Sequence, residues 1–306
     1  MVPTLRLGAR EMPVLGYGVG TAWYKASGDK AQALKASLQM ALDAGVRHID
    51  DAEMYQNEVV TGEAIRQWLA RTGTKREELF ITNKFIDVDK GACAVCDELL
   101  AKTGLEYFDL FLVHSCCTTN DEAFKKSLPE IWEEMMTLHK SGKVKEIGVS
   151  NWRICDLESI KDAPIQPCCN QVEAHPFLQQ AGLLEYCKKR NILVTCYGPQ
   201  APLYKDFLQS SPELCAVVQQ AAKRAQLNEG QVLLRWAYQT GRVPITTTSK
   251  PERMQEYLKI FESELTDSEV AAISAAGLRA PQRRVYWTQC PKFFAKDPST
   301  EPESAL

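Results

Sequence analysis

Short apolar runs alternate with amphipathic segments along most of the chain. The runs are partly β-branched, as buried strands are, and they predict strands over 14–20, 48–50, 80–84, 110–114, 144–150, 169–173, 192–197 and 243–247. The segments between them predict amphipathic helices over 30–44, 58–71, 92–102, 128–141, 183–190 and 251–260. Eight strands alternating with helices in 306 residues favour a closed (β/α)8 TIM barrel of the α/β class over an open sheet.

Other segments decorate this alternation. Leu5-Arg6-Leu7 and Val14 flank a turn at 8–11, which predicts an N-terminal β-hairpin that plugs the barrel floor. Further helices are expected over 211–225, 228–239 and 266–276, and 277–306 is a C-terminal tail with no clear periodicity, expected to carry a substrate loop. No Gly/Ser-rich or Pro-rich linker divides the chain. We therefore expect a single domain over 1–306.

Four polar residues lie at or just beyond the ends of the predicted strands. Asp50, Lys84 and His114 each close an apolar run, and Tyr55 follows Asp50 by five residues. The carboxyl ends of parallel barrel strands meet at one rim, where barrel enzymes place their chemistry. Taken singly, His114 could be a core residue, Lys84 a surface lysine, and Asp50 with Asp51 a helix N-cap pair. Their joint placement predicts one cleft.

These four groups suit proton transfer to a carbonyl oxygen. A phenol such as Tyr55 is a poor donor at neutral pH unless its pKa is lowered. An ammonium at ~4 Å and an effective dielectric of ~20 stabilises the phenolate by at most about 4 kcal/mol, so we expect Lys84 to lower the pKa of Tyr55. Asp50 would hold Lys84 charged, and His114 would hydrogen-bond the carbonyl oxygen.

Composition narrows the classes of protein. A hydrophobic content of 45% and a net charge of −3 are ordinary for a soluble enzyme and give no support for a nucleic-acid partner. No apolar stretch approaches the ~20 residues that span a bilayer, and residues 1–10 lack the apolar region of a signal peptide. We expect a cytoplasmic protein. The terminal Ser304-Ala305-Leu306 faintly resembles a peroxisomal address, without its central basic residue.

The cysteines favour thiols over disulfides or metal ligands. Eleven is an odd number, and without a signal peptide reduced thiols are the default. Cys93 and Cys96 form a C-x-x-C, but no second pair at suitable spacing accompanies it. No metal site is expected.

Several motifs together resemble the aldo-keto reductase family. They occur in order and at the family's spacing, and they run through Gly45-Val46-Arg47-His48-Ile49-Asp50-Asp51-Ala52 with Tyr55, Ile81-Thr82-Asn83-Lys84, Leu112-Val113-His114, Ile147-Gly148-Val149-Ser150-Asn151-Trp152, Asn170-Gln171-Val172-Glu173-Ala174-His175-Pro176, and Pro251-Glu252-Arg253-Met254 with Glu256. The resemblance implies a (β/α)8 barrel and NADPH-dependent carbonyl reduction. Tyr55 would be the acid, with Asp50, Lys84 and His114 as its partners.

The resemblance also implies a cofactor site. Ser150, Asn151 and Gln171 would hold the nicotinamide carboxamide, and Tyr197 would stack on the ring; Ser150-Asn151 could instead cap a helix. The remaining residues expected around the cofactor are Gly20, Thr21, Ala22, Asp50, Gly198, Gln200, Thr247, Thr248, Ser249, Lys250, Arg253 and Glu256.

Two departures affect that site. Thr247 replaces the family's lysine for the ribose 2′-phosphate, and Lys250 or Arg253 could supply the charge instead, so NADPH remains the expected cofactor over NADH. Tyr257 stands where the family often has an adenine-binding Asn, which puts that contact in doubt. The sequence 197–201, Tyr-Gly-Pro-Gln-Ala, alters the diphosphate loop.

A narrower likeness concerns the substrate, expected to be a small-molecule carbonyl compound. Segments 21–25, 246–251 and 285–287 resemble the fungal α-keto amide and conjugated polyketone reductases. Ser115-Cys116 stands where many family members have Trp-Pro after the histidine, which implies a smaller or more polar pocket near His114. A vicinal dicarbonyl, a keto ester or an aldehyde would fit such a pocket. Substrate contacts are expected from Tyr55, His114, Trp23, Tyr24, Cys116, Trp152 and Trp287. Trp23 and Trp152 could equally be core packing.

Two alternatives to a broad carbonyl reductase stay open. One is an NADPH-binding regulatory barrel of the potassium-channel β-subunit type with little turnover. The other is a biosynthetic enzyme dedicated to one ketone. We expect a monomer or weak dimer, without a nucleic-acid or membrane partner.

Overall fold

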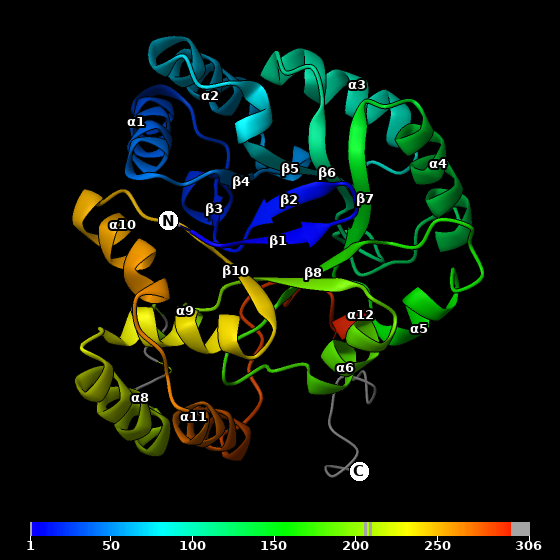
Figure 1. The fold of residues 1–306 in the computed structure, drawn as a ribbon. Coiled ribbons are helices and arrows are strands. Elements are labelled where there is room, and N and C mark those ends of the chain that lie inside the picture. The colour runs from blue at the N-terminus through cyan, green and yellow to red at the C-terminus, as the bar shows by residue number, and fades with distance from the viewer. Residues whose placement is uncertain (1, 205–206, 208–209, 295–306) are drawn as a thin grey trace.

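Eight parallel strands close into a barrel. The computed structural model describes residues 2–204, 207 and 210–294. Its barrel strands are β3 (Gly16–Gly18), β4 (His48–Asp50), β5 (Phe80–Phe85), β6 (Phe108–Val113), β7 (Val144–Ser150), β8 (Cys169–Glu173), β9 (Leu193–Tyr197) and β10 (Arg242–Thr246). Each pairs with the next in chain order, and β10 pairs with β3 to close the ring (Figure 1). The predicted (β/α)8 barrel is confirmed.

Helices form the outer ring around this barrel (Figure 1). Those between the strands are α1 (Gly28–Ala44), α2 (Glu58–Thr72), α3 (Ala92–Thr103), α4 (Leu128–Lys140), α5 (Ile154–Glu158), α6 (Ala181–Lys189), α7 (Ala201–Tyr204), α8 (Pro212–Ala225) and α9 (Glu229–Gln239), and after β10 come α10 (Pro251–Leu258), α11 (Asp267–Arg279) and α12 (Pro291–Phe294). Local sequence sets many boundaries. Ser127 and Glu130 form a capping box at the start of α4, and Gly45 ends α1 with φ +111°. The short helices α5, α7 and α12 have too few turns to show periodicity in the sequence.

The N-terminal hairpin closes the amino end of the barrel. Strands β1 (Thr4–Leu7) and β2 (Arg10–Pro13) lie across the barrel mouth (Figure 1), and Leu7 and Met12 pack into the apolar cluster at its floor. The turn is tighter than predicted: Arg10 pairs with Leu7, which leaves only residues 8 and 9 in it. A plugged amino end leaves the carboxyl end of the barrel for a site.

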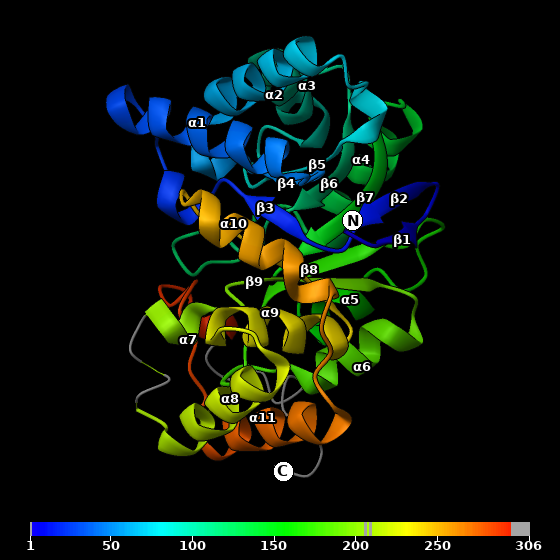
Figure 2. The same ribbon diagram turned by 60° about the vertical axis from the view of Figure 1, so that its left-hand side comes forward.

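Two further predictions need correction. The first barrel strand is Gly16–Gly18, shorter than 14–20, because the amide of Val14 bonds Pro3 O in the plug segment. Helix α11 continues through Gly277 to Arg279, so the tail begins later than expected. A Cβ on Gly277 would lie 2.1 Å from Pro176 O, and the glycine lets α11 pack against that loop. Helices α8 and α11 lie side by side outside α9 (Figure 2).

Candidate active site

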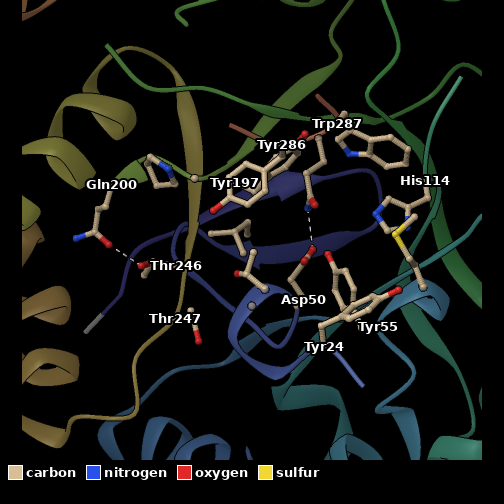
Figure 3. Close-up of a pocket in the computed structure, with 18 of the residues that line it drawn as sticks. Tyr24, Asp50, Tyr55, His114, Tyr197, Gln200, Thr246, Thr247, Tyr286 and Trp287 are labelled. Carbon is tan, nitrogen blue, oxygen red and sulfur yellow. Dashed lines mark hydrogen bonds between the residues drawn. The ribbon is translucent and has the colours of Figure 1, made fainter. Parts of the chain in front are cut away.

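A cavity of about 440 Å³ opens at the carboxyl end of the barrel. Figure 3 shows Gln200, Thr246 and Thr247 at one end, His114 and Trp287 at the other, and Tyr55 beside Asp50 between them. The lining comes from the ends of several strands and from the C-terminal segment: Gly18, Gly20, Thr21, Tyr24, Asp50, Met54, Tyr55, His114, Gln171, Tyr197, Gly198, Pro199, Gln200, Ile245, Thr246, Thr247, Tyr286, Trp287 and Gln289. The predicted convergence of polar groups at one rim is therefore present.

Lys84 is the hub of a buried polar network. Its Nζ donates to Asp50 Oδ1 at 2.6 Å and to Asp51 O at 2.9 Å, and lies 3.4 Å from the Tyr55 hydroxyl. The second carboxylate oxygen of Asp50 accepts from Gln171 Nε2 at 2.7 Å. Lys84 is fully buried and Tyr55 faces the cavity. The surface-lysine alternative for Lys84 is thus wrong.

Neither Asp50 nor Asp51 caps a helix. The short 3-10 helix Glu53–Tyr55 begins after Ala52, and α2 begins after Asn57. Asp51 instead accepts the amide of Ala52 at 2.8 Å, while its Oδ2 has no hydrogen-bond partner among the described residues. Burial raises the pKa of Asp51 to about 8, the amide of Ala52 opposing the shift. The carboxyl beside the network is therefore largely protonated at neutral pH.

The pKa of Tyr55 differs from the expectation. Burial raises it to about 12, and the nearby Lys84 ammonium lowers it by less than burial raises it. Burial works against the charge of Lys84 as well, but the charge of Asp50 and its hydrogen bond outweigh burial, and the pKa of Lys84 is raised. Tyr55 is thus a protonated phenol and Lys84 a charged ammonium at neutral pH. The predicted pairing is present, whereas the predicted net lowering of the phenol pKa was wrong.

His114 presents a neutral imidazole to the same cavity. Burial, and then the charge of Lys84, lowers its pKa well below 6.5. The ring lies edge-on to Tyr55, with centroids 5.8 Å apart, and edge-on to Trp287 at the same separation. Its Nδ1 has no hydrogen-bond partner within the described part of the chain. A neutral imidazole beside a phenol can donate one hydrogen bond to a substrate oxygen.

The residues expected at a nicotinamide carboxamide are linked to one another. Tyr197 donates its hydroxyl to Asn151 Oδ1 at 2.6 Å, and Asn151 Nδ2 donates to His114 O at 2.9 Å and Ser150 Oγ at 3.0 Å. Ser150 Oγ in turn donates to Gln171 O at 2.8 Å. Helix α5 has Arg153 as its N-cap, so the capping alternative for Ser150-Asn151 is wrong. Gln171 and Tyr197 line the cavity, and Ser150 and Asn151 lie behind them.

The other end of the cavity collects part of the expected cofactor set. Gly20, Thr21, Gly198, Gln200 and Thr247 line it, whereas Ala22 lies outside it. A Cβ on Gly20 would approach Tyr55 Cζ to 2.8 Å, so a bare backbone is needed there.

The sequence analysis did not predict several residues that line the cavity. The sequence features that could have revealed them differ from residue to residue. Thr246 donates to Gln200 Oε1 at 2.7 Å and belongs to the segment 246–251, whose likeness to the fungal reductases could have revealed it. Tyr286 and Gln289 lie in the tail, which has no periodicity, although Tyr286 belongs to the segment 285–287 that resembles the fungal reductases. Trp287 was found there through its likeness to a family segment.

The start of α10 lies beyond the cavity lining. Lys250 is exposed and Arg253 half-buried, and neither side chain has a hydrogen-bond or ion-pair partner in the part of the chain that the structure describes. Thr248 and Ser249 precede them, the Thr248 hydroxyl accepting the amide of Lys250 at 3.1 Å. Two cations at a helix N-terminus suit a phosphate.

Three other residues on or near α10 already interact with other parts of the protein, two through hydrogen bonds and one through burial. Glu256 accepts from Asn228 Nδ2 at 2.9 Å, and Thr247 accepts from Trp23 Nε1 at 3.2 Å. Tyr257 is buried in the main apolar cluster, away from solvent. An adenine contact from Tyr257 is therefore not supported.

The predicted substrate residues divide into two groups. Tyr24 and Trp287 line the cavity together with Tyr55 and His114. Trp152 is 0% exposed, packs against Trp132 and donates to Ser115 O at 3.2 Å. Cys116 and Trp23 are buried in the same core, and the indole Nε1 of Trp23 donates to Thr247 Oγ1. The core-packing alternative holds for Trp152 and Trp23, and direct substrate contact is not supported for these three.

The cysteines and helices of the described residues give no sign of a metal site or of a membrane-spanning helix. Cys93 and Cys96 on α3 form no disulfide, and no group of three or more His, Cys, Asp or Glu among the described residues is arranged to hold a metal ion. Within 2–204, 207 and 210–294, no helix combines the length and apolarity needed to cross a bilayer.

Comparison with known proteins gives the family. Residues 14–277 match the model of the aldo/keto reductase family. The chain is 35% identical over 94% of both sequences to an NADPH-dependent alpha-keto amide reductase of Saccharomyces cerevisiae. It is 36% identical to an NAD/NADP-dependent indole-3-acetaldehyde reductase of Schizosaccharomyces pombe, over 89% of this chain and 94% of the relative. A glyoxal reductase of Bacillus subtilis is 35% identical over 87% and 89%, respectively.

Solved structures agree with these relatives. An aldo-keto reductase of Bombyx mori in complex with NADP superposes with a TM-score of 0.81 at 28% identity, covering 93% of this chain and 96% of that one. An aldo/keto reductase of Brucella melitensis gives a TM-score of 0.76 at 33% identity, covering 90% and 100%. The chain belongs to the aldo/keto reductase family and is an oxidoreductase.

Proposed function

We propose that Tyr55 is the general acid of an NADPH-dependent reduction of vicinal dicarbonyl compounds, keto esters or keto amides. The observation that carries the proposal is the buried Asp50–Lys84 pair next to a phenol that faces a cavity. Proton donation to a carbonyl oxygen needs a protonated donor, a group that stabilises its conjugate base and a group that fixes the oxygen. Tyr55, Lys84 and His114 have these three properties.

Each residue has one task in this scheme. Bound NADPH would supply the hydride to the carbonyl carbon. The Tyr55 hydroxyl gives its proton to the carbonyl oxygen, and the Lys84 ammonium at 3.4 Å stabilises the phenolate that remains. Asp50 keeps Lys84 charged and oriented, and neutral His114 hydrogen-bonds the oxygen and directs it.

The cavity has features that fit NADPH. Gly20 and Gly198 leave room at the lining, and Tyr197 offers a ring face beside Gln171. Lys250 and Arg253 would hold the ribose 2′-phosphate in place of the lysine that Thr247 replaces, since both are cations without a partner in the described chain. Ser150, Asn151 and Gln171 would fix the carboxamide directly or through their mutual hydrogen bonds.

The substrate class rests on the wall near His114 and on the relatives. Trp287 packs against His114 at this end, and Tyr24 and Gln289 also line the cavity, where the Gln289 amide can bind a second carbonyl group. Relatives named for α-keto amides and for glyoxal support the same class. A dicarbonyl is also more electrophilic than a simple ketone, which suits a phenol whose pKa burial raises.

A binding-only role of the channel-subunit type is the weaker proposal. Such a role needs no proton donor, whereas Tyr55 faces the cavity beside Lys84 and His114. We further propose that 1–306 acts as one domain, as a cytoplasmic monomer or weak dimer. Ser304-Ala305-Leu306 lies outside the described residues, and a peroxisomal address there stays a minor hypothesis.

The test is NADPH oxidation at 340 nm with a panel of methylglyoxal, ethyl pyruvate, a keto amide, benzaldehyde and cyclohexanone. NADH is run in parallel. We expect higher kcat/KM for the first three compounds and for NADPH over NADH. Turnover of the simple aldehyde and ketone alone would refute the substrate class, and tight NADPH binding without any turnover would favour the binding-only role.

A further inference from the structure

The C-terminal segment 283–294 crosses the carboxyl end of the barrel, where two carboxylates, those of Glu173 and Asp121, bind its backbone amides. On one side, the amides of Val285 and Tyr286 donate to the two carboxylate oxygens of Glu173, at 2.7 and 3.1 Å. On the other side, the amide of Lys292 lies 3.0 and 3.1 Å from the two carboxylate oxygens of Asp121. The stretch between these anchors carries Trp287.

Glu173, which holds the first of these anchors, is a buried carboxylate. It ends β8, is 0% exposed, and accepts also from His175 Nε2 at 3.1 Å, with the Arg284 guanidinium 3.7 Å away. A buried carboxylate is costly unless hydrogen bonds and opposite charge surround it. Here most of that compensation comes from 284–286. Burial of Glu173 and ordering of the segment therefore depend on each other.

The held segment forms one wall of the cavity. The ring of Tyr286 packs edge-on against Tyr197, with centroids 5.4 Å apart, and Trp287 packs edge-on against His114. Trp287 has a φ of +56°, a backbone conformation that aromatic residues rarely adopt without support from their surroundings. The two amides just before it are those that Glu173 binds (Figure 3 shows both rings at the cavity).

We propose that Glu173 is a positioning residue for substrate selection: by binding the amides of Val285 and Tyr286 it sets where Tyr286 and Trp287 stand in the substrate wall. Glu173 itself is outside the cavity lining, so it acts through the segment. The activity readout of this inference rests on the proposed carbonyl reduction. A second measurement that needs no turnover therefore tests the role of Glu173 separately from the proposed carbonyl reduction.

The first experiment compares Glu173→Gln with the wild type. Glutamine keeps the shape and one acceptor, but its NH2 group then faces a backbone amide, so one of the two bonds is lost. We expect the KM for the bulky ethyl phenylglyoxylate to rise about tenfold, the value for one lost hydrogen bond to a charged group. The kcat for small methylglyoxal and the Kd for NADPH should change less than about twofold, since neither depends on that bond.

A matched control lies at the opposite end of the barrel. Glu146 on β7 accepts the amide of Ala9 at 2.7 Å, so Glu146→Gln also weakens a strand-to-loop carboxylate–amide bond. It should leave the discrimination between the two substrates unchanged. An equal change in both variants would overturn the proposal.

A double-mutant cycle with Trp287→Ala tests whether Glu173 acts through the wall. We expect Glu173→Gln to have almost no further effect on the KM ratio once Trp287 is gone. Independent, additive effects, or a parallel loss of kcat for both substrates together with NADPH affinity, would overturn the inference.

Hydrogen exchange supplies the readout without turnover. The amides of Val285 and Tyr286 should exchange about tenfold faster in Glu173→Gln, and unchanged protection would overturn the proposal even if no carbonyl compound is reduced. Should Glu173→Gln fail to fold, Asp121→Asn loosens the other anchor and is expected to shift the same KM ratio. If folded Asp121→Asn leaves the ratio of the two KM values unchanged, the anchors of segment 283–294 do not position the substrate wall, which would contradict the proposal.

Discussion

Lys84 Nζ lies 2.6 Å from Asp50 Oδ1, and both side chains are buried at the carboxyl end of the barrel. A buried ion pair contributes little net stability compared with apolar residues, yet removal of one partner leaves an unpaired buried charge. The Asp50 carboxylate thus fixes the position of the Lys84 ammonium next to the Tyr55 hydroxyl. It links the stability of this rim to the proposed chemistry.

Lys84→Met should destabilise the protein and abolish the proposed proton transfer. We expect a loss of about 3–5 kcal/mol in the free energy of unfolding, because Asp50 stays buried without its cation. Urea unfolding measures this loss. In Lys84→Met/Asp50→Asn most of the stability should return while reduction stays impaired, and recovery of both properties would contradict the assigned tasks.

Asp51 should make the protein less stable at high pH. Its pKa in the folded state is about 8, against an ordinary value of 3.8, so the folded state retains a proton that the unfolded state has lost between these pH values. The contribution of Asp51 is therefore complete below pH ~4 and is lost progressively as pH rises towards 8. Asp51→Asn mimics the protonated carboxyl and should be more stable than the wild type at pH 9. The comparison is urea unfolding at pH 5 and pH 9; a smaller gain at pH 9 than at pH 5 contradicts the account.

His114 should not impose a pH limb near its ordinary pKa. Because burial and Lys84 hold its pKa well below 6.5, the imidazole stays neutral in the folded protein above that value. We expect kcat/KM for a dicarbonyl to be flat between pH 6 and 8. A drop with a midpoint near 6.5 would mean that the free enzyme has an ordinary histidine there.

Arg253 should discriminate between the two nicotinamide cofactors. Removal of a cation that holds the 2′-phosphate weakens NADPH binding and leaves NADH, which lacks that group, unaffected. We expect Arg253→Ala to raise the KM for NADPH about tenfold with little change for NADH. Lys259→Ala, an exposed cation beyond the other end of the same helix, is the matched control. Equal effects of Arg253→Ala on both cofactors would rule out phosphate recognition by this residue.

The sequence was most informative where chemistry is tied to the ends of strands. Asp50, Lys84 and His114 close apolar runs, and the parallel barrel necessarily brings such ends together. The hairpin plug followed from Leu5-Arg6-Leu7 and Val14 on either side of a turn, although that turn proved shorter. These features depend on local pattern and on one topological rule.

Contacts between residues far apart in the sequence could not be predicted from local pattern and barrel topology. The segment 283–294 has no periodicity, because its conformation depends on Glu173 and Asp121, which lie more than a hundred residues away. Trp152 and Cys116 follow strand ends as site residues do, and only the packing shows them turned into the core. The prediction of the Tyr55 pKa was wrong for a similar reason. The direction of the pKa shift depends on how far burial outweighs the charge of Lys84, and burial is known only from the structure.

The most direct test of the account is Tyr55→Phe, which removes the proposed acid and keeps the ring. We measure the kcat of methylglyoxal reduction and, in parallel, NADPH binding by quenching of protein fluorescence. If Tyr55 is the proton donor, we expect kcat to fall by at least about two orders of magnitude, the usual size of general acid catalysis, with the Kd for NADPH unchanged. A Tyr55→Phe enzyme that reduces methylglyoxal at near wild-type rate would contradict the assignment of Tyr55 as the proton donor.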